Sequence, residues 1–145
     1  MKISIAGDHA GFDQKQLLKT FLSDTLGHEV IDRGPHTEER VDYPDFAVLV
    51  ARDVAEGVAE RGVLVCGTGL GMAIAADKVA GIRAVNITTP EFAALCRQHN
   101  DANVITLSGR FVEREVNEAI LTTFLTTDFE GGRHADRVKK IMALD

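Results

Sequence analysis

The residues best suited to chemistry lie in one glycine-rich stretch, Val63–Met72, with the sequence VLVCGTGLGM. An apolar run ends at Cys66, and the glycines that follow alternate with other residues: Gly67, Gly69 and Gly71. Glycines let backbone N–H groups approach a ligand, and such groups favour an anion. A thiol beside them could act as a base or nucleophile. The stretch therefore predicts Cys66 and Thr68 as reactive groups, although a cysteine after Leu-Val is also a common small core residue.

Two arginines near the end of the chain could hold a phosphate. Arg133 and Arg137 lie four residues apart, so they share a face if a helix covers them. Two guanidiniums bind a phosphate through forked hydrogen bonds. Arg110, after another apolar run, is a further cation. The alternative for the pair is a solvated, charged helix.

Several polar groups could serve proton transfer or sugar binding. His99 and Asn100 lie in the sequence RQHNDAN, and an imidazole carries protons near neutral pH. Asp8 and His9 separate an apolar run from a helix-like segment, and Tyr43 could offer its hydroxyl to a polyol. Each has an ordinary alternative: a polar loop around His99, a helix cap at Asp8, and a tight turn at Tyr43.

Composition narrows the class of protein. The chain has 145 residues, 45% of them hydrophobic, which predicts a single domain over residues 1–145 with a real core. A net charge of −6 argues against nucleic-acid binding by the surface as a whole. No apolar run approaches the ~20 residues that span a membrane. The two cysteines lack a metal-ligand spacing, and no signal-peptide pattern is present, so a cytoplasmic protein with reduced thiols is expected.

Alternating strands and helices must position these residues. Apolar runs and breaker residues predict strands at 2–6, 28–32, 62–66, 81–87 and 103–107. Helical spacing and caps predict helices at 12–26, 44–56, 70–79, 90–98, 112–126 and 135–143. Five alternations of this kind predict an α/β fold with a parallel sheet and helices on both faces.

Ligands of such sheets bind beyond the carboxyl ends of the strands. Asp8 follows the first predicted strand, Tyr43 lies after the second, and Cys66 ends the third. His99 instead precedes the fifth strand, which is the wrong end for the same pocket of one subunit. We therefore expect a second subunit to supply His99 and Asn100.

Six motifs occur in order along the chain and are more specific together than alone. They are GDHAGF at 7–12, DYPD at 42–45, CGTGLG at 66–71, GIRA at 81–84, RQHND at 97–101 and FEGGRH at 129–134. In these motifs, over essentially its whole length, the chain resembles the RpiB/LacAB family of sugar-phosphate isomerases.

The resemblance implies a Rossmann-like three-layer α/β/α fold with a five-stranded parallel sheet. It also implies interconversion of ribose 5-phosphate and ribulose 5-phosphate through a cis-enediolate, without metal or cofactor, in the pentose phosphate pathway. Family members form homodimers, sometimes homotetramers, with active sites shared between subunits.

The resemblance also implies roles for the reactive groups. Cys66 resembles the base that moves a proton between C1 and C2, and Thr68 with the glycine-loop amides resembles the group that stabilises the enediolate. His99 would assist opening of the furanose ring, and Asp8 would bind sugar hydroxyls. Some members use a glutamate one turn after the glycine loop, but Met72 occupies that position here.

The substrate-binding residues follow in the same way. Arg133 and Arg137 resemble phosphate ligands, with His9 nearby, and Tyr43 would line the sugar site. The partner subunit would contribute three residues: His99, Asn100 and Arg110.

The chain departs from the usual family pattern at two places that bear on the substrate. The usual Ala-Asn-Lys is Ala76-Asp77-Lys78 here, and the usual Leu-Gly is Leu107-Ser108-Gly109. Three alternatives to a five-carbon substrate therefore stay open: a six-carbon phosphate such as allose or galactose 6-phosphate, a free aldose, or a non-catalytic subunit that binds a sugar phosphate.

Overall fold

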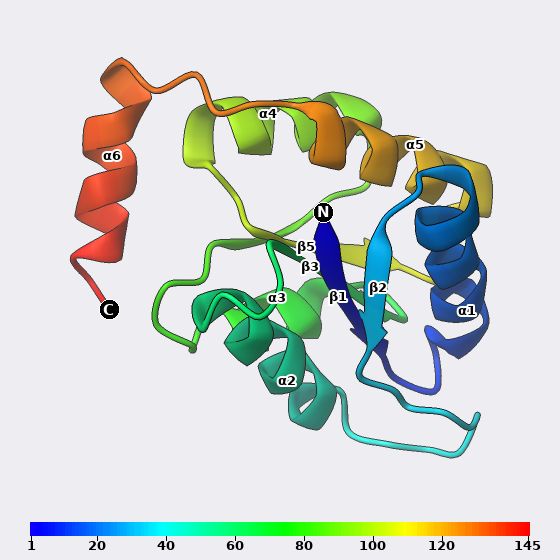
Figure 1. The fold of residues 1–145 in the computed structure, drawn as a ribbon. Helices are drawn as coiled ribbons and strands as arrows, with labels where there is room; N and C mark the ends of the chain where they lie inside the picture. The colour runs from blue at the N-terminus through cyan, green and yellow to red at the C-terminus, as the bar shows by residue number, and fades with distance from the viewer.

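Five parallel strands form the centre of the molecule, in the order β2-β1-β3-β5-β4 (Figure 1). In the computed structural model, which describes residues 1–145, the strands are β1 Lys2–Gly7, β2 Glu29–Asp32, β3 Arg61–Cys66, β4 Ala84–Asn86 and β5 Val104–Ser108. The order reverses direction between β1 and β3. Ligands of open α/β sheets bind at such a reversal, and Asp8 and Cys66 lie there, at the carboxyl ends of these two strands.

Side chains that alternate along each strand build two apolar cores. On β3, Val63 and Val65 belong to one core, whereas Leu64 and Cys66 belong to the other. Successive strand residues face opposite sides of a sheet, so nearly continuous apolar runs are required when helices cover both sides. The Cys66 side chain therefore points toward the side covered by α2 and α3.

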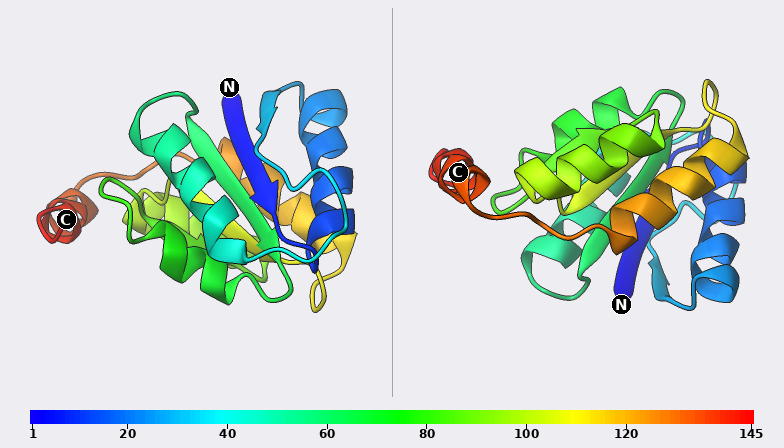
Figure 2. Two further views of the ribbon diagram at one scale, coloured as in Figure 1. Left: turned by 90° about the horizontal axis from the view of Figure 1, so that it is seen from below. Right: turned by 90° about the horizontal axis from the view of Figure 1, so that it is seen from above.

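Helices cover both faces of the sheet, as the views from above and below show (Figure 2). They are α1 Phe12–Thr20, α2 Tyr43–Ala55, α3 Leu70–Ala76, α4 Pro90–Asn100, α5 Arg114–Thr126 and α6 Arg133–Met142. The core on one face is built with α1, α4 and α5, and the core on the other with α2 and α3. The last helix, α6, projects beside the layers and is reached by a segment that runs along α4 (Figure 1).

The α/β fold, the parallel sheet and the order of elements predicted from the sequence are confirmed. Most elements differ from their predicted extent by a few residues; α3, for example, ends at Ala76 and not at Val79. The first predicted helix continues past α1 as one π-helical turn, η1 Phe21–Thr25. The fourth strand begins only at Ala84, because Gly81 takes a left-handed φ of 88° and Ile82 still belongs to a turn. No helix is long and apolar enough to cross a membrane.

Candidate active site

The thiol of Cys66 lies at the carboxyl edge of the sheet beneath the glycine loop. Its side chain is buried, and Sγ accepts a hydrogen bond from the Gly69 N–H at 3.0 Å. Gly69 can fold back over the sulfur because it takes a φ of 85°, a conformation that favours glycine. The sulfur thus serves as a hydrogen-bond acceptor beside the loop. The geometry therefore suits Cys66 to accept a proton.

The other groups of the glycine loop follow the thiol in the chain. The Thr68 hydroxyl accepts a hydrogen bond from the Leu70 N–H at 3.2 Å. Gly71 has no side chain where the Tyr43 ring lies, since a Cβ there would approach Tyr43 Cζ to 2.5 Å. Tyr43 begins α2, so the fold brings it to the thiol loop from a distant part of the sequence.

The turn after β1 packs against the same loop. The Asp8 carboxylate is 6% exposed and accepts a hydrogen bond from the Gly11 N–H at 2.9 Å. A Cβ on Gly11 would lie 2.9 Å from Cys66 N, so the turn touches the end of β3. Asp8 therefore closes the turn before α1 and also lies at the candidate site, but it is not the helix cap of its ordinary interpretation, because the N-cap residue is Gly11. His9 Nδ1 is 3.2 Å from Val41 O, in the loop that leads to Tyr43.

Arg110 also lies near Cys66 within its own chain. Its side chain lies against Gly67, where a Cβ would be 3.4 Å from both Cδ and Nη1. The Arg110 N–H donates to Gly67 O at 3.2 Å, and the Gly109 N–H donates to Cys66 O at 2.8 Å. Within one chain Arg110 thus lies beside the loop of Cys66, and the prediction that a partner supplies it stays a prediction.

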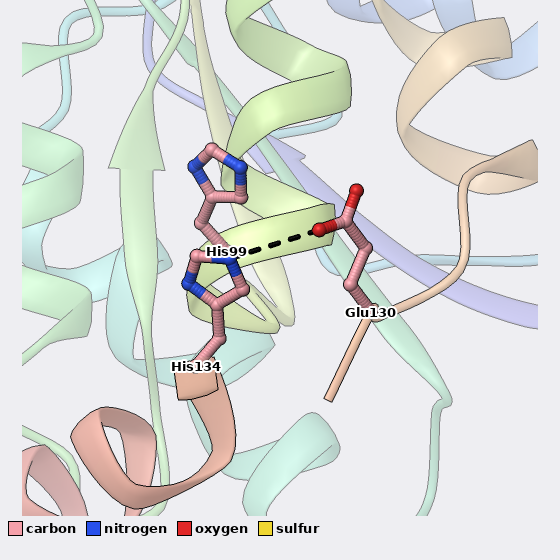
Figure 3. A group of neighbouring side chains, drawn as sticks. All are labelled: His99, Glu130 and His134. Atoms are coloured by element: carbon pink, nitrogen blue, oxygen red, sulfur yellow. Dashed lines mark ion pairs between the residues drawn. The ribbon is translucent and has the colours of Figure 1, made fainter. Parts of the chain in front are cut away.

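His99 lies at the opposite end of the sheet. It belongs to the last turn of α4, which runs against the strands and leads into the start of β5. Its ring stacks on that of His134, with centroids 4.3 Å apart and planes at 14° (Figure 3). His134 Nε2 is 3.7 Å from a Glu130 carboxylate oxygen. The prediction that one subunit does not join His99 to Cys66 agrees with this placement.

Two residues beside His99, Glu130 and His134, were not predicted as site residues. Burial first, and then the positive charges of His99 and Arg133, lower the pKa of His134 below its ordinary value. His134 is therefore neutral near pH 7 and able to exchange a proton with a neighbour. Glu130 and His134 both belong to the motif FEGGRH, which marked this segment, but only the fold brings His134 onto the ring of His99.

Arg133 and Arg137 flank this pair on α6. Both are exposed, and Arg137 Nη1 donates to Arg133 O at 3.3 Å, so the predicted shared helical face is confirmed. Within one chain the two arginines lie near His99 and Asn100 and away from His9, because α6 contacts the end of α4, whereas His9 lies beyond β1. Their predicted role as phosphate ligands stays a prediction.

Three of these side chains offer ligand atoms of the kind that bind metals. The ligand atoms of His99, Glu130 and His134 all lie within 4.8 Å of one another. Nearly parallel stacked rings, however, direct their in-plane lone pairs side by side and not toward one point. The neighbouring Arg133 and Arg137 also repel a cation. The arrangement therefore suits proton transfer beside an anion better than metal binding.

Comparison with known proteins gives a consistent result over the whole chain. Residues 3–141 match the family model described as Ribose/Galactose Isomerase. The chain is 46% identical over 144 residues to ribose-5-phosphate isomerase B of Escherichia coli (strain K12), covering 99% of this chain and 96% of that protein. It is also similar to the structure of Clostridium thermocellum ribose-5-phosphate isomerase B, with 48% identity, a TM-score of 0.97 and coverage of 99% and 97%. A third similar structure is that of Mycoplasma genitalium ribose-5-phosphate isomerase B with bound ribulose-5-phosphate. Its sequence identity is 43% and its TM-score 0.94, and the match covers 99% of this chain and 95% of that chain.

Proposed function

The chain belongs to the ribose/galactose isomerase family, and from this premise we propose that it interconverts ribose 5-phosphate and ribulose 5-phosphate. One observation carries the proposal: a buried thiol receives an N–H from a glycine loop at the carboxyl end of a central strand. That is the arrangement an aldose–ketose isomerase needs, because its base must act next to donors that stabilise a developing oxyanion.

The thiol acts as the base in this proposal. Cys66, as thiolate, takes the proton from C2 of the open-chain aldose and leaves an enediolate. The same proton returns to C1 while the O2 hydroxyl proton passes to O1, which gives the ketose. Met72, buried on the first turns of α3, offers no carboxylate for this task. No oxidant or reductant is needed, since the hydrogen only changes carbon within one molecule.

The glycine loop stabilises the enediolate oxygens. The N–H groups of Gly67 and Thr68 donate to no acceptor within the chain, so they are available to a ligand. The Thr68 hydroxyl lies beside them, and Gly71 leaves room for the Tyr43 ring at the sugar end. Preorganised donors of this type act on the charge that develops in the transition state.

The remaining substrate contacts divide between the two ends of the chain. We propose that Asp8, His9, Tyr43 and Arg110 bind the sugar from the thiol side. His99 assists opening of the furanose ring, helped by the neutral His134, and Asn100, Arg133 and Arg137 lie beside it to bind the other end of the substrate. A furanose has to open before its C2 proton becomes acidic, so both groups are needed in one site.

The complete site therefore forms between two copies of the chain, in a homodimer or homotetramer. The supporting observation is the separation of Cys66 at the carboxyl end of β3 from His99 at the end of α4. A second copy of the chain completes the site if its His99 and the residues around it lie against Cys66 and the residues around it in this chain.

A turnover assay of Cys66→Ala tests the proposal. Wild-type protein should isomerise ribose 5-phosphate faster than allose 6-phosphate, galactose 6-phosphate or ribose. Removal of a general base costs roughly 10²–10⁴-fold in kcat, so the variant should lose at least that much while it still binds a phosphorylated competitor. Cys96→Ala is the matched control, because Cys96 is a buried thiol of the helical core.

Each alternative has its own outcome in this assay. If the protein prefers a six-carbon sugar phosphate or a free aldose, that sugar is its substrate, and Cys66 keeps its proposed role as base. If the folded wild-type protein turns over none of these sugars, the remaining alternative is a non-catalytic subunit that binds a sugar phosphate. Cys66→Ala turnover equal to that of Cys96→Ala means that the base is wrongly identified.

A further inference from the structure

We propose that Asn86, Thr106 and Ser108 are positioning residues that hold the glycine loop from behind and turn its N–H groups toward the substrate. The proposal rests on the proposed function, since it names the side chains that preorganise that site. None of the three is among the residues that we propose to contact the sugar. They come from β4 and β5, at the sheet edge next to the thiol.

Ser108 holds the first part of the loop. Its hydroxyl donates to Gly67 O at 2.7 Å and accepts from the Phe111 N–H at 2.9 Å. Ser108 is also the strand partner of Cys66 and is 1% exposed. One buried hydroxyl therefore ties the thiol loop to the turn that carries Arg110.

Asn86 and Thr106 hold the second part. Asn86 Nδ2 donates to Thr68 O at 3.1 Å, and the Thr106 hydroxyl donates to Gly69 O at 2.7 Å. Asn86 Nδ2 also lies 3.1 Å from Thr106 Oγ1, so the two side chains support each other. Thr106 is fully buried. Hydrogen bonds in such surroundings are stronger than in water and hold their partners in one orientation.

The held carbonyls decide where the amides point. In a planar trans peptide the C=O and the following N–H point in opposite directions. Asn86 holds the peptide whose N–H belongs to Gly69, and that N–H points at Cys66 Sγ at 3.0 Å. Ser108 holds the peptide whose N–H belongs to Thr68, which has no acceptor in the chain. The strands thus bind one side of the loop and leave the other side to the substrate.

Thr106 acts on the next peptide and, through it, on Thr68. It holds Gly69 O, and the Leu70 N–H of the same peptide donates to the Thr68 hydroxyl at 3.2 Å. Without the Thr106 hydroxyl, the Thr68 side chain loses its fixed orientation. The three positioning residues therefore act on the thiol, on the free amides and on the hydroxyl that are proposed to carry the reaction.

Kinetics of Ser108→Ala and Thr106→Val provide the first test. Each change removes one hydroxyl and keeps the strand, so kcat should fall about 5- to 10-fold per variant, while KM for ribose 5-phosphate stays within about twofold. Affinity for an enediolate mimic, the hydroxamate of a phosphorylated four-carbon sugar acid, should fall by the same factor as kcat/KM.

A buried hydroxyl outside the site supplies the matched control. Ser4 on β1 is fully buried and donates to Asp53 at 2.6 Å. Ser4→Ala should lower the melting temperature but leave kcat and the hydroxamate affinity unchanged. If Ser108→Ala and Thr106→Val behave like Ser4→Ala, the three residues only support the fold and the proposal is wrong.

Amide hydrogen exchange gives a second test that does not depend on activity. Asn86→Ala should speed exchange of the Gly69 amide, and Thr106→Val that of the Leu70 amide, with little change elsewhere in β3. Unchanged exchange rates at both amides would overturn the proposal, and so would faster exchange with unaltered kcat. If the wild-type protein isomerises no sugar, the proposed function fails, while the exchange data still show whether these side chains hold the loop.

Discussion

Two cysteines of one chain show how surroundings decide the role of a residue. Cys96 faces the core from α4, its Sγ donates to Ala93 O at 3.2 Å, and burial raises its pKa to about 11. Cys66 instead receives an N–H from a glycine loop. The prediction that Cys96 is a core residue, made from its apolar helical face, is confirmed. The role of Cys66 as base stays a prediction.

The titration of His134 is a prediction at the same scale. Burial and the positive charge of His99 lower its pKa, so an NMR titration should give a value below the ordinary ~6.5, and His99→Asn should raise it. The unfolded chain binds the proton more readily, so stability falls as the pH drops through ~6.5 and levels off below the folded pKa. A value at or above 6.5, or no response to His99→Asn, would contradict the stacked arrangement.

At the scale of elements, ion pairs hold the end of α4 in place. Asp101 ends the helix in the left-handed conformation, with a φ of 48°. Its carboxylate binds Arg97 at 2.8 Å and Arg83 at 3.1 Å. Arg83 also donates to Met142 Sδ of α6 at 3.1 Å. One carboxylate therefore links α4, the start of β4 and α6, and it fixes the turn that carries His99.

We predict that Asp101→Asn destabilises the protein by about 3 kcal/mol, because it leaves the buried Arg97 without its counter-charge. Asparagine tolerates the left-handed conformation, so backbone strain does not explain the loss. Denaturant unfolding measures it. Glu118→Gln, which breaks the partly exposed pair with Arg114 at 3.1 Å, is the control and should cost at most about 1 kcal/mol. Equal losses in the two variants would mean that Asp101 supports nothing beyond a surface pair.

Strand and helix order could be predicted from the sequence because apolar runs, caps and glycine breaks are local signals. The spacing of Arg133 and Arg137 likewise gave the correct helical face. Grouping of residues across the sheet was harder. Arg110 joins Cys66 because of a turn held by Ser108, and His134 joins His99 because the segment before α6 runs along α4. These are contacts between distant segments, which no local pattern encodes.

At the scale of the whole molecule, the division of the site predicts complementation. Cys66→Ala and His99→Asn homo-oligomers should each be nearly inactive. Mixed under conditions that exchange subunits, a dimer with one subunit of each kind has one intact site, because one wild-type Cys66 meets one wild-type His99. Activity should therefore approach a quarter of the wild-type value, since about half of the dimers are mixed. Proven subunit exchange without recovery of activity would refute a shared site.

The distance between Cys66 and His99 also has a consequence for how the protein is handled. If neither copy is complete, catalysis requires an encounter, and the rate per chain becomes a function of protein concentration. On serial dilution the specific activity should be constant at first and then fall once the concentration passes the dissociation constant of the pair. After rapid dilution the activity should decay to its new value at the dissociation rate. An assay run far below that concentration would describe the separated chains, and a low reading there would measure association and not chemistry.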